Sequence, residues 1–381
     1  MDWRAWPWWA QCVALWLVLV LSLAGFVGAG VVDLREGYDP VIGLPAGVWP
    51  AIWARWDAPY YFNIARDGYQ AHPYAMGYFP LYPLLIKGLT ALTGLHLVTA
   101  GVLIAHGSYL VALLAMYRLA MTFRGEAAFA WRAVVALAVF PSAFFFLAMY
   151  AESLALAAGL LVIDFALRGR WIKSGLALAV AAATRPVGWL LGLVLLVEFL
   201  RRRSFNWRSL GTFAAAGALG ASGLVVYILY LHALTGSFTA IPHATALWLR
   251  TYAYPWQTLW DSLVIMVAGN GVPDDWFLYV SNLIDLGFTV LILALIGLAI
   301  RRLPLSLIIY MAVSVVFLLS LHGVRVVPLW GLTRWAASLA PIYLVLADRL
   351  RGGVRFWLLA GLSAAAQIAL MVWWASGRWV G

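Results

Sequence analysis

Apolar runs of about 20 residues follow one another along the whole chain, and short polar segments rich in arginine separate them. A helix of that length crosses the roughly 30 Å hydrocarbon core of a bilayer. Short alternating segments, which are typical of a transmembrane β-barrel, are not seen. The chain is therefore predicted to be an all-α polytopic membrane protein with about 11 transmembrane helices, in a range of roughly 9–12. The expected helices are 11–32, 97–119, 131–148, 151–168, 174–185, 187–200, 209–233, 277–300, 303–321, 335–350 and 355–375.

The composition agrees with this pattern. Of 381 residues, 65% are hydrophobic and 10% are charged, whereas a soluble domain has about 25% charged residues. The 22 tryptophans and 17 tyrosines suit aromatic belts at both membrane interfaces. A net charge of +10 would indicate nucleic acid binding in a soluble protein, but here the charge reflects topology, so we expect membrane lipids and no nucleic acid as partners. The single cysteine, Cys12, excludes an intrachain disulfide.

The placement of arginine predicts the orientation. If the N-terminus with Arg4 is cytoplasmic, the positive-inside rule places five basic clusters in cytoplasmic loops. Two long segments, 33–96 and 234–276, then lie on the outer face of one transmembrane domain that comprises the whole chain. Since nearly all basic residues are arginine, we expect a bacterial cytoplasmic membrane. The five clusters are Arg118/Arg124/Arg132, Arg168/Arg170/Lys173, Arg201/Arg202/Arg203/Arg208, Arg301/Arg302 and Arg349/Arg351/Arg355.

Segment 174–200 allows two structures. Basic clusters at both ends favour a hairpin of two short legs that is broken at Thr184-Arg185-Pro186. Each leg would span roughly 18 Å, less than the membrane core, so Arg185 would lie in a cavity. The alternative is a single tilted, proline-kinked helix with Arg185 reaching the interface, which would invert the topology downstream.

The stretch RWDAPYYFNIARDGY (55–69) is the longest polar segment and predicts a short interfacial helix. Asp57 occupies the N-cap position, Pro59 the first turn and Gly68 the end. Asp57 has two compatible interpretations. It is a cap that stabilises the helix by about 1 kcal/mol, or an outward carboxylate beside a lipid-accessible cleft, available as a general base.

The next motif is YFPLYPLL (78–85). Its two prolines predict no regular helix before Pro83. We expect the segment to cross the mouth of a cavity with Tyr78, Phe79 and Tyr82 as walls. A plain interfacial aromatic anchor is the alternative.

Four later stretches complete a set of motifs: FPSAFFFLAMYAESL (140–154), ATRPVGWL (183–190), LTGSFTAIPHATALWLR (234–250) and GLTRWAASLAPIYLVLAD (331–348). Together with 55–69 and 78–85, they resemble the PIG-V-like family of mannosyltransferases, which includes the enzyme that adds the second mannose to glycosylphosphatidylinositol. The resemblance covers most of residues 50–350. It implies a bundle of the GT-C superfamily of polyprenyl-phosphate-sugar-dependent glycosyltransferases, with interfacial helices in the first long outer loop.

The resemblance implies transfer of a sugar, expected to be mannose, from a polyprenyl-phosphate donor lipid to a hydroxyl of a glycolipid, glycan or protein acceptor. The transfer would occur at the outer membrane face with inversion. Asp57 matches the acidic residue that GT-C enzymes carry in their first outer loop, which implies a general base. Arg185 and Arg334 are expected to bind the lipid phosphate, since guanidinium groups match phosphate oxygens bidentately. The full set of substrate-binding candidates is Arg55, Trp56, Tyr60, Tyr78, Tyr82, Glu152, Arg185, His322, Arg325 and Arg334.

Several candidates also have ordinary interpretations. Arg334 could be an interfacial anchor, and Glu152 could orient Arg185, bind a sugar hydroxyl or simply start a helix. The two acids of NGVPDD (270–275) are more typical of a turn than of a metal site, and we expect no metal or other cofactor. The competing functions are a transporter or flippase of a lipid-linked sugar, which needs charged residues near the bilayer midplane, and a scaffold, which needs no convergence of the charged candidates.

Overall fold

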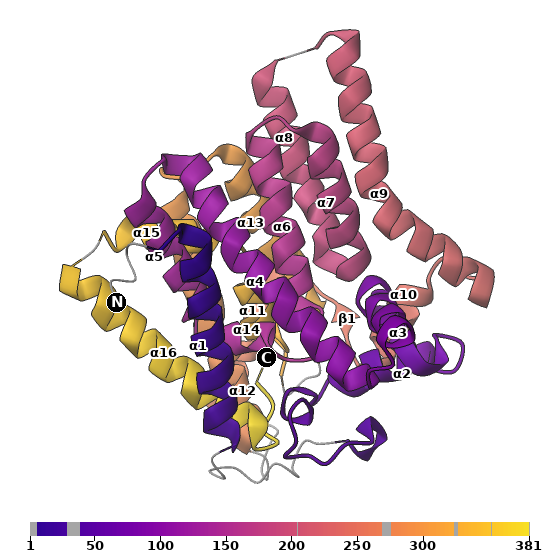
Figure 1. Cartoon of the computed structure of the whole chain (residues 1–381). Helices are drawn as coiled ribbons and strands as arrows, with labels where there is room; N and C mark the ends of the chain where they lie inside the picture. Colours follow the sequence, from indigo (N-terminus) through magenta and orange to yellow (C-terminus); the bar gives the residue numbers. More distant parts are fainter. Residues whose placement is uncertain are drawn as a thin grey trace.

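The computed structural model describes residues 6–28, 39–203, 205–268, 276–323, 327–351 and 353–380. Within these ranges, every predicted span overlaps a helix (Figure 1). These helices are α1 (Trp8–Gly28), α4 (Leu97–Arg124), α5 (Ala127–Ala138), α6 (Glu152–Leu167), α7 (Trp171–Thr184), α8 (Gly192–Arg202), α9 (Trp207–Thr235), α12 (Trp276–Ala299), α13 (Leu305–Leu319), α14 (Leu332–Ala337), α15 (Pro341–Arg349) and α16 (Gly353–Ala375). The remaining helices are α2 (Ala58–Asp67), α3 (Leu81–Thr93), α10 (Ala240–Leu247) and α11 (Pro255–Ala268), and the strands are β1 (Thr251–Tyr252) and β2 (Leu321–His322).

The protein is a multi-pass helical membrane protein. Among the described residues, α1, α4, α9, α12 and α16 are each long and apolar enough to cross a membrane, by length and composition. Shorter apolar helices, including α5, α7 and α13, pack among them. The centre of the core lies where α4 contacts α5 and α6, while α7 packs along α9.

Two predicted spans are wrong in detail. The run 131–148 is not one helix, because α5 ends at Ala138 and residues 139–151 are irregular apart from a 3₁₀ turn at Ala143–Phe146. Pro141 explains the break, since a helix usually ends before the residue that precedes a proline. Residues 142–151 are all buried, and non-helical backbone at membrane depth is tolerated where protein surrounds it. Pro341 likewise divides the run 335–350 into α14 and α15.

Segment 174–200 is a hairpin, not a kinked helix. A 3₁₀ turn at Pro186–Leu191 joins α7 to α8, and the two open ends of the hairpin, opposite this turn, lie close together. The guanidinium carbon of Arg202 lies 5.5 Å from the centroid of the Trp171 ring. Gly188 permits the turn, because a Cβ there would lie 2.0 Å from the carbonyl oxygen of Ala181. The hairpin holds Arg185 at its closed end.

Three of the predicted cytoplasmic clusters meet on one carboxylate. Asp348 of α15 accepts hydrogen bonds from Arg124 at the end of α4 and, at 3.1 Å each, from Arg302 and Arg351. These arginines precede or follow different helices, so their clusters lie at the same end of the bundle. This arrangement agrees with the relative sidedness that the positive-inside rule predicts.

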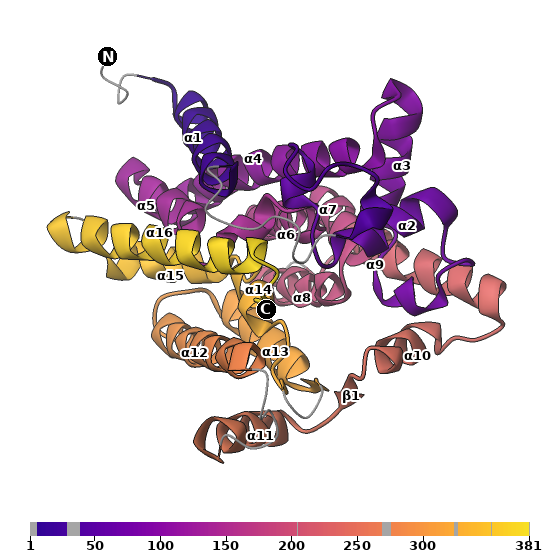
Figure 2. The same ribbon diagram turned by 90° about the horizontal axis from the view of Figure 1, so that it is seen from below.

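The short helix predicted within 55–69 is confirmed as α2, which begins after Asp57 and ends before Gly68, where φ is +81°. The prediction of no regular helix before Pro83 is wrong, because α3 already begins at Leu81. Pro83 fits in its first turn, where a backbone N–H has no helical partner anyway. On the other long loop, α10, β1 and α11 form an arm at the edge of the bundle (Figure 2), and β1 pairs with β2 so that Thr251 faces His322.

Candidate active site

A cavity of about 770 Å³ lies between α2, the α7–α8 turn, α10, α12 and α14. Its lining is mostly aromatic and apolar. Its charged lining residues, within the described part of the chain, are Asp57, Glu152, Arg185, Arg250, Arg334 and Arg378. A cavity of this size suits a small-molecule headgroup that is oriented by a few polar groups.

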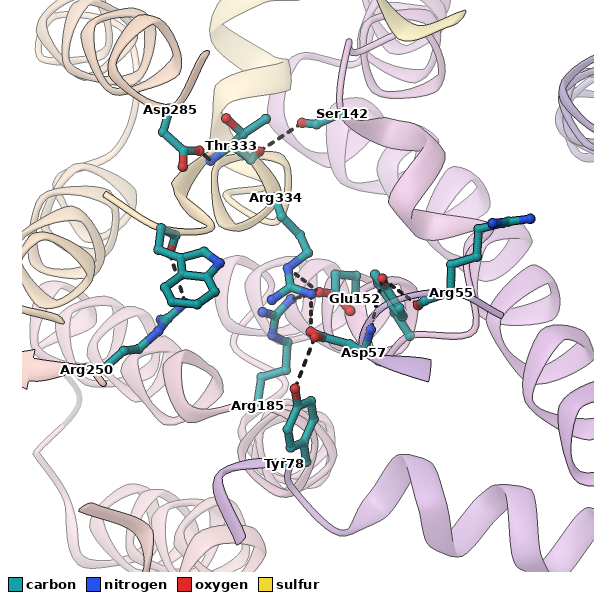
Figure 3. Close-up of polar contacts among 12 residues, drawn as sticks. Arg55, Asp57, Tyr78, Ser142, Glu152, Arg185, Arg250, Asp285, Thr333 and Arg334 are labelled. Atoms are coloured by element: carbon teal, nitrogen blue, oxygen red, sulfur yellow. Dashed lines mark hydrogen bonds and ion pairs between the residues drawn. The ribbon is translucent and has the colours of Figure 1, made fainter. Parts of the chain in front are cut away.

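Asp57 stands at the centre of the polar contacts (Figure 3). One carboxylate oxygen pairs with the guanidinium of Arg334, and the other accepts a hydrogen bond from the Tyr78 hydroxyl at 3.1 Å. The Asp57 side chain makes no capping hydrogen bond to α2, so the cap interpretation holds for its position but not for its side chain. Trp56, immediately before it, adopts a φ of +57°, which is uncommon for a bulky residue. The local backbone thus turns the carboxylate away from its own helix and into the cavity.

Glu152 links two arginines. Its Oε1 lies 2.7 Å from Nη1 of Arg185 and 3.2 Å from Nε of Arg334. Its Oε2 is buried and has no hydrogen-bond partner among the described residues. The four charges therefore form one row, Asp57–Arg334–Glu152–Arg185, which we call the charge row. The Arg185 guanidinium carbon also lies 4.1 Å from the centroid of the Trp335 ring.

The buried irregular segment 139–151 positions one side of the charge row. The Met149 N–H donates to the carbonyl of Trp53 at 2.9 Å. The Tyr150 hydroxyl donates to the carbonyl of Arg55 at 2.9 Å and lies 3.4 Å from the Asp57 nitrogen. The segment thereby ties the start of α6, where Glu152 lies, to the loop that presents Asp57.

The turn before α14 positions the other side. Gly331, with a φ of +87°, precedes the six-residue helix that carries Arg334. Asp285 of α12 accepts hydrogen bonds from the N–H groups of Gly331 and Thr333 at 3.2 and 2.8 Å. On the opposite side, the Ser142 hydroxyl donates to the Thr333 carbonyl at 3.0 Å. The sequence interpretation missed Asp285, although a lone acid inside the apolar run 277–300 was a signal that could have found it.

The sequence interpretation also missed Arg250. It lies between α10 and β1, lines the cavity, and donates to the carbonyl of Trp330 at 2.9 Å. No carboxylate of the described residues forms an ion pair with it. Burial, reinforced by the nearby Arg334 charge, lowers the pKa of Arg250 to about 10. The site therefore holds a partly desolvated cation whose charged form an incoming anion would stabilise.

The predicted site residues do not all converge. Trp56, Tyr60, Tyr78, Glu152, Arg185 and Arg334 line the cavity with Asp57. Burial and the nearby Asp57 charge raise the pKa of Tyr60 to about 12, so its hydroxyl stays protonated.

Three candidates lie outside the lining, and one cannot be placed. Tyr82 is fully buried and donates to the carbonyl of Gly101 at 2.9 Å, so its prediction as a cavity wall is wrong. Arg55 is buried, and its side chain points away from Asp57 (Figure 3). His322 pairs with Asp261 at 2.9 Å instead of facing the cavity. Arg325 lies outside the described residues.

Within the described ranges, no three His, Cys, Asp or Glu side chains gather in a way that could hold a metal ion. The acids of NGVPDD lie outside those ranges. The expectation of a metal-independent site therefore stays a prediction.

Comparison with known proteins shows which solved structures share this fold. No family model matches the chain, and no curated protein matches it. The chain shares its fold with ArnT. Against ArnT from Cupriavidus metallidurans bound to undecaprenyl phosphate, the TM-score is 0.53 at 19% identity, covering 92% of this chain and 63% of that one. Against the apo state the TM-score is 0.55 at 18% identity, covering 93% and 62%.

This chain thus spans less than two thirds of the length of ArnT. The likeness confirms the predicted all-α polytopic membrane fold.

Proposed function

We propose that this protein is a GT-C-type glycosyltransferase that moves a sugar from a polyprenyl-phosphate donor lipid to an acceptor hydroxyl. The observation that carries the proposal is the charge row, because it places a carboxylate beside guanidinium groups inside one cavity. The shared fold adds support, since the ArnT structure was solved with undecaprenyl phosphate bound. The motif resemblance to PIG-V-like enzymes supports mannose as the sugar, and a glycolipid, glycan or protein remains the acceptor class.

The proposed chemistry is a single displacement. The acceptor oxygen attacks the anomeric carbon of the donor sugar while the bond from that carbon to the phosphate oxygen breaks. Asp57 takes the proton of the acceptor hydroxyl, and the bonding electron pair leaves with the lipid phosphate. Attack from the side opposite the leaving group inverts the configuration. A positioned base of this kind contributes about 10²–10⁴-fold to the rate.

Arginines would stabilise the leaving phosphate, and we expect no metal to be required. Arg185 and Arg334 are already neutralised within the charge row, whereas Arg250 has only a carbonyl partner among the described contacts. Arg250 therefore joins Arg185 and Arg334 as a phosphate-binding candidate, and it is the one of the three whose charge no carboxylate of the described residues neutralises. We also propose that the cavity faces the outer side of a bacterial cytoplasmic membrane. The arginines clustered on Asp348 support this sidedness because basic loops stay in the cytoplasm.

The test is donor turnover, measured as release of lipid phosphate from synthetic polyprenyl-phosphate mannose by purified protein with candidate acceptors. Asp57→Asn is nearly isosteric and removes the base, so the rate should fall at least about 10²-fold. Tyr78→Phe is the first control, because it removes the other partner of the same carboxylate and leaves the base. Asp67→Asn is the second control, since it changes an acid at the far, exposed end of α2.

Each outcome has a distinct meaning. Loss of turnover in Asp57→Asn alone supports the general base. Equal turnover in Asp57→Asn and wild type means that another group is the base, and Glu152 is then the first candidate. Absence of turnover in the wild type contradicts the donor. Movement of an intact lipid-linked sugar across a vesicle membrane would instead favour the transporter function.

A further inference from the structure

Asp285 is a carboxylate inside a membrane-spanning helix, and the proposed reaction gives it no role. It lies in α12 and is 1% exposed. Charged groups at such positions are costly and are retained for a purpose. Among the described residues its carboxylate forms no ion pair with an arginine side chain, and it accepts hydrogen bonds from two backbone N–H groups, those of Gly331 and Thr333.

The turn that Asp285 holds is connected to both cavity arginines. The carbonyl of Trp330 accepts the hydrogen bond of Arg250, and the Trp330 ring centroid lies 5.9 Å from the Arg250 guanidinium carbon. Arg334 follows Thr333 directly. Since α14 has no side-chain cap of its own, Asp285 supplies from another helix the acceptor that its first N–H groups need.

We propose that Asp285 is a positioning residue that holds the turn from Trp330 to Thr333 and thereby aims the guanidinium groups of Arg250 and Arg334 at one anionic headgroup. The identity of that headgroup as a lipid phosphate rests on the proposed function, whereas the positioning itself does not. A displacement of about 1 Å can cost about 10²-fold in a reaction that depends on orientation. Asp285 therefore acts on the site without touching the substrate.

The experiment compares three variants of the whole protein. Asp285→Ala removes both accepting oxygens, and Asp285→Asn keeps one of them. Asp164→Asn is the matched control, because Asp164 is also 1% exposed and also lies in a helix, but its partners are Thr122 and Arg168 rather than the turn.

Two quantities are measured for each variant. The first is amide hydrogen exchange of the peptide 327–337, which contains the turn. The second is the affinity of the folded protein for undecaprenyl phosphate, followed where turnover exists by the donor KM and kcat. We expect faster exchange and at least about tenfold weaker binding in Asp285→Ala, a smaller effect in Asp285→Asn, and neither effect in the control. In turnover, KM for the donor should rise more than KM for the acceptor.

The outcomes separate this inference from the proposed function. Unchanged exchange in 327–337 overturns the positioning role, whatever the donor is. Faster exchange with unchanged lipid affinity overturns the link from the turn to the arginines. If the wild type binds no undecaprenyl phosphate while exchange still responds to Asp285, the positioning of the turn stands and the donor class is wrong. Lower thermal stability in all three variants with no selective change in 327–337 would mean that Asp285 is only a buried acid.

Discussion

Replacing Glu152 by glutamine removes one charge from the middle of the charge row and leaves its shape nearly unchanged. Glu152 is the shared partner of Arg185 and Arg334, at 2.7 and 3.2 Å. Arg334 keeps Asp57 as a second partner, but Arg185 loses the one carboxylate with which it forms an ion pair among the described residues. The substitution therefore leaves a buried guanidinium without an opposite charge.

The magnitude follows from burial. The side chains of Arg185 and Glu152 are 6% and 2% exposed. Two unit charges 2.7 Å apart attract by roughly 6 kcal/mol at an effective dielectric constant of about 20, and desolvation offsets part of this. Removing one partner of such a pair costs about 3–5 kcal/mol. In the double variant Glu152→Gln/Arg185→Gln, the remaining Asp57–Arg334 pair is again neutral. The double variant should therefore lose less stability than the two single variants lose together, by about 1–3 kcal/mol.

The assay is the free energy of unfolding in mixed micelles, measured by SDS titration for wild type, both single variants and the double variant. The matched control is the same cycle on Glu198 and Arg201, a pair at 2.9 Å whose arginine is 50% exposed. Its coupling should stay below about 1 kcal/mol, because solvent screens the charge of the half-exposed arginine. A coupling energy below about 0.5 kcal/mol between Glu152 and Arg185 would refute the reasoning, since the two charges would then act independently.

Three further predictions concern packing, metal and pH. Gly223→Ala should destabilise the protein by about 1–3 kcal/mol in the same titration, because a Cβ there would lie 2.1 Å from a backbone carbonyl of α7, whereas Gly217→Ala on the same helix meets nothing within 4 Å and should be tolerated. Donor turnover should survive treatment with EDTA, and a loss that Mg²⁺ or Mn²⁺ restores would contradict the metal-independent site. Hydrogen bonds from Arg66 and His72 lower the pKa of Asp67, so its contribution to stability should be present above its unfolded pKa of about 3.9 and fade as pH falls below it. The stability of Asp67→Asn, measured from pH 2 to 5, should lack that part of the acid slope.

The sequence predicted structure correctly where the backbone preferences of a residue determine a helix end or a turn. Pro59 and Gly68 set the ends of α2, and the Arg185-Pro186 step set the turn between the hairpin legs. The functional candidates Asp57, Glu152, Arg185 and Arg334 came from motif resemblance together with their charge in an apolar context, and they do lie in one cavity.

The sequence was less informative where only the direction of a side chain decides. Tyr82 and Tyr78 belong to the same motif, yet Tyr82 points into the helix packing and Tyr78 into the cavity. The irregular segment 139–151 is as apolar as a helix that faces lipid, so periodicity alone does not separate the two cases. The place of Arg250 in the site could not be predicted from the sequence, because its partner Trp330 lies 80 positions further along the chain.

The charge row also fixes an order of assembly during synthesis. Glu152 and Arg185 lie on neighbouring elements, the start of α6 and the closed end of the α7–α8 hairpin, so they can pair early. Asp57 and Arg334 are 277 positions apart, which corresponds to roughly 14–55 s of translation at about 5–20 residues per second. During that interval Tyr78 and Tyr150, which contact Asp57, have been synthesised, but Arg334 has not. The cavity is consequently completed only after α14 has left the ribosome, and a chain truncated before α14 would hold the acid without the arginine that pairs with it.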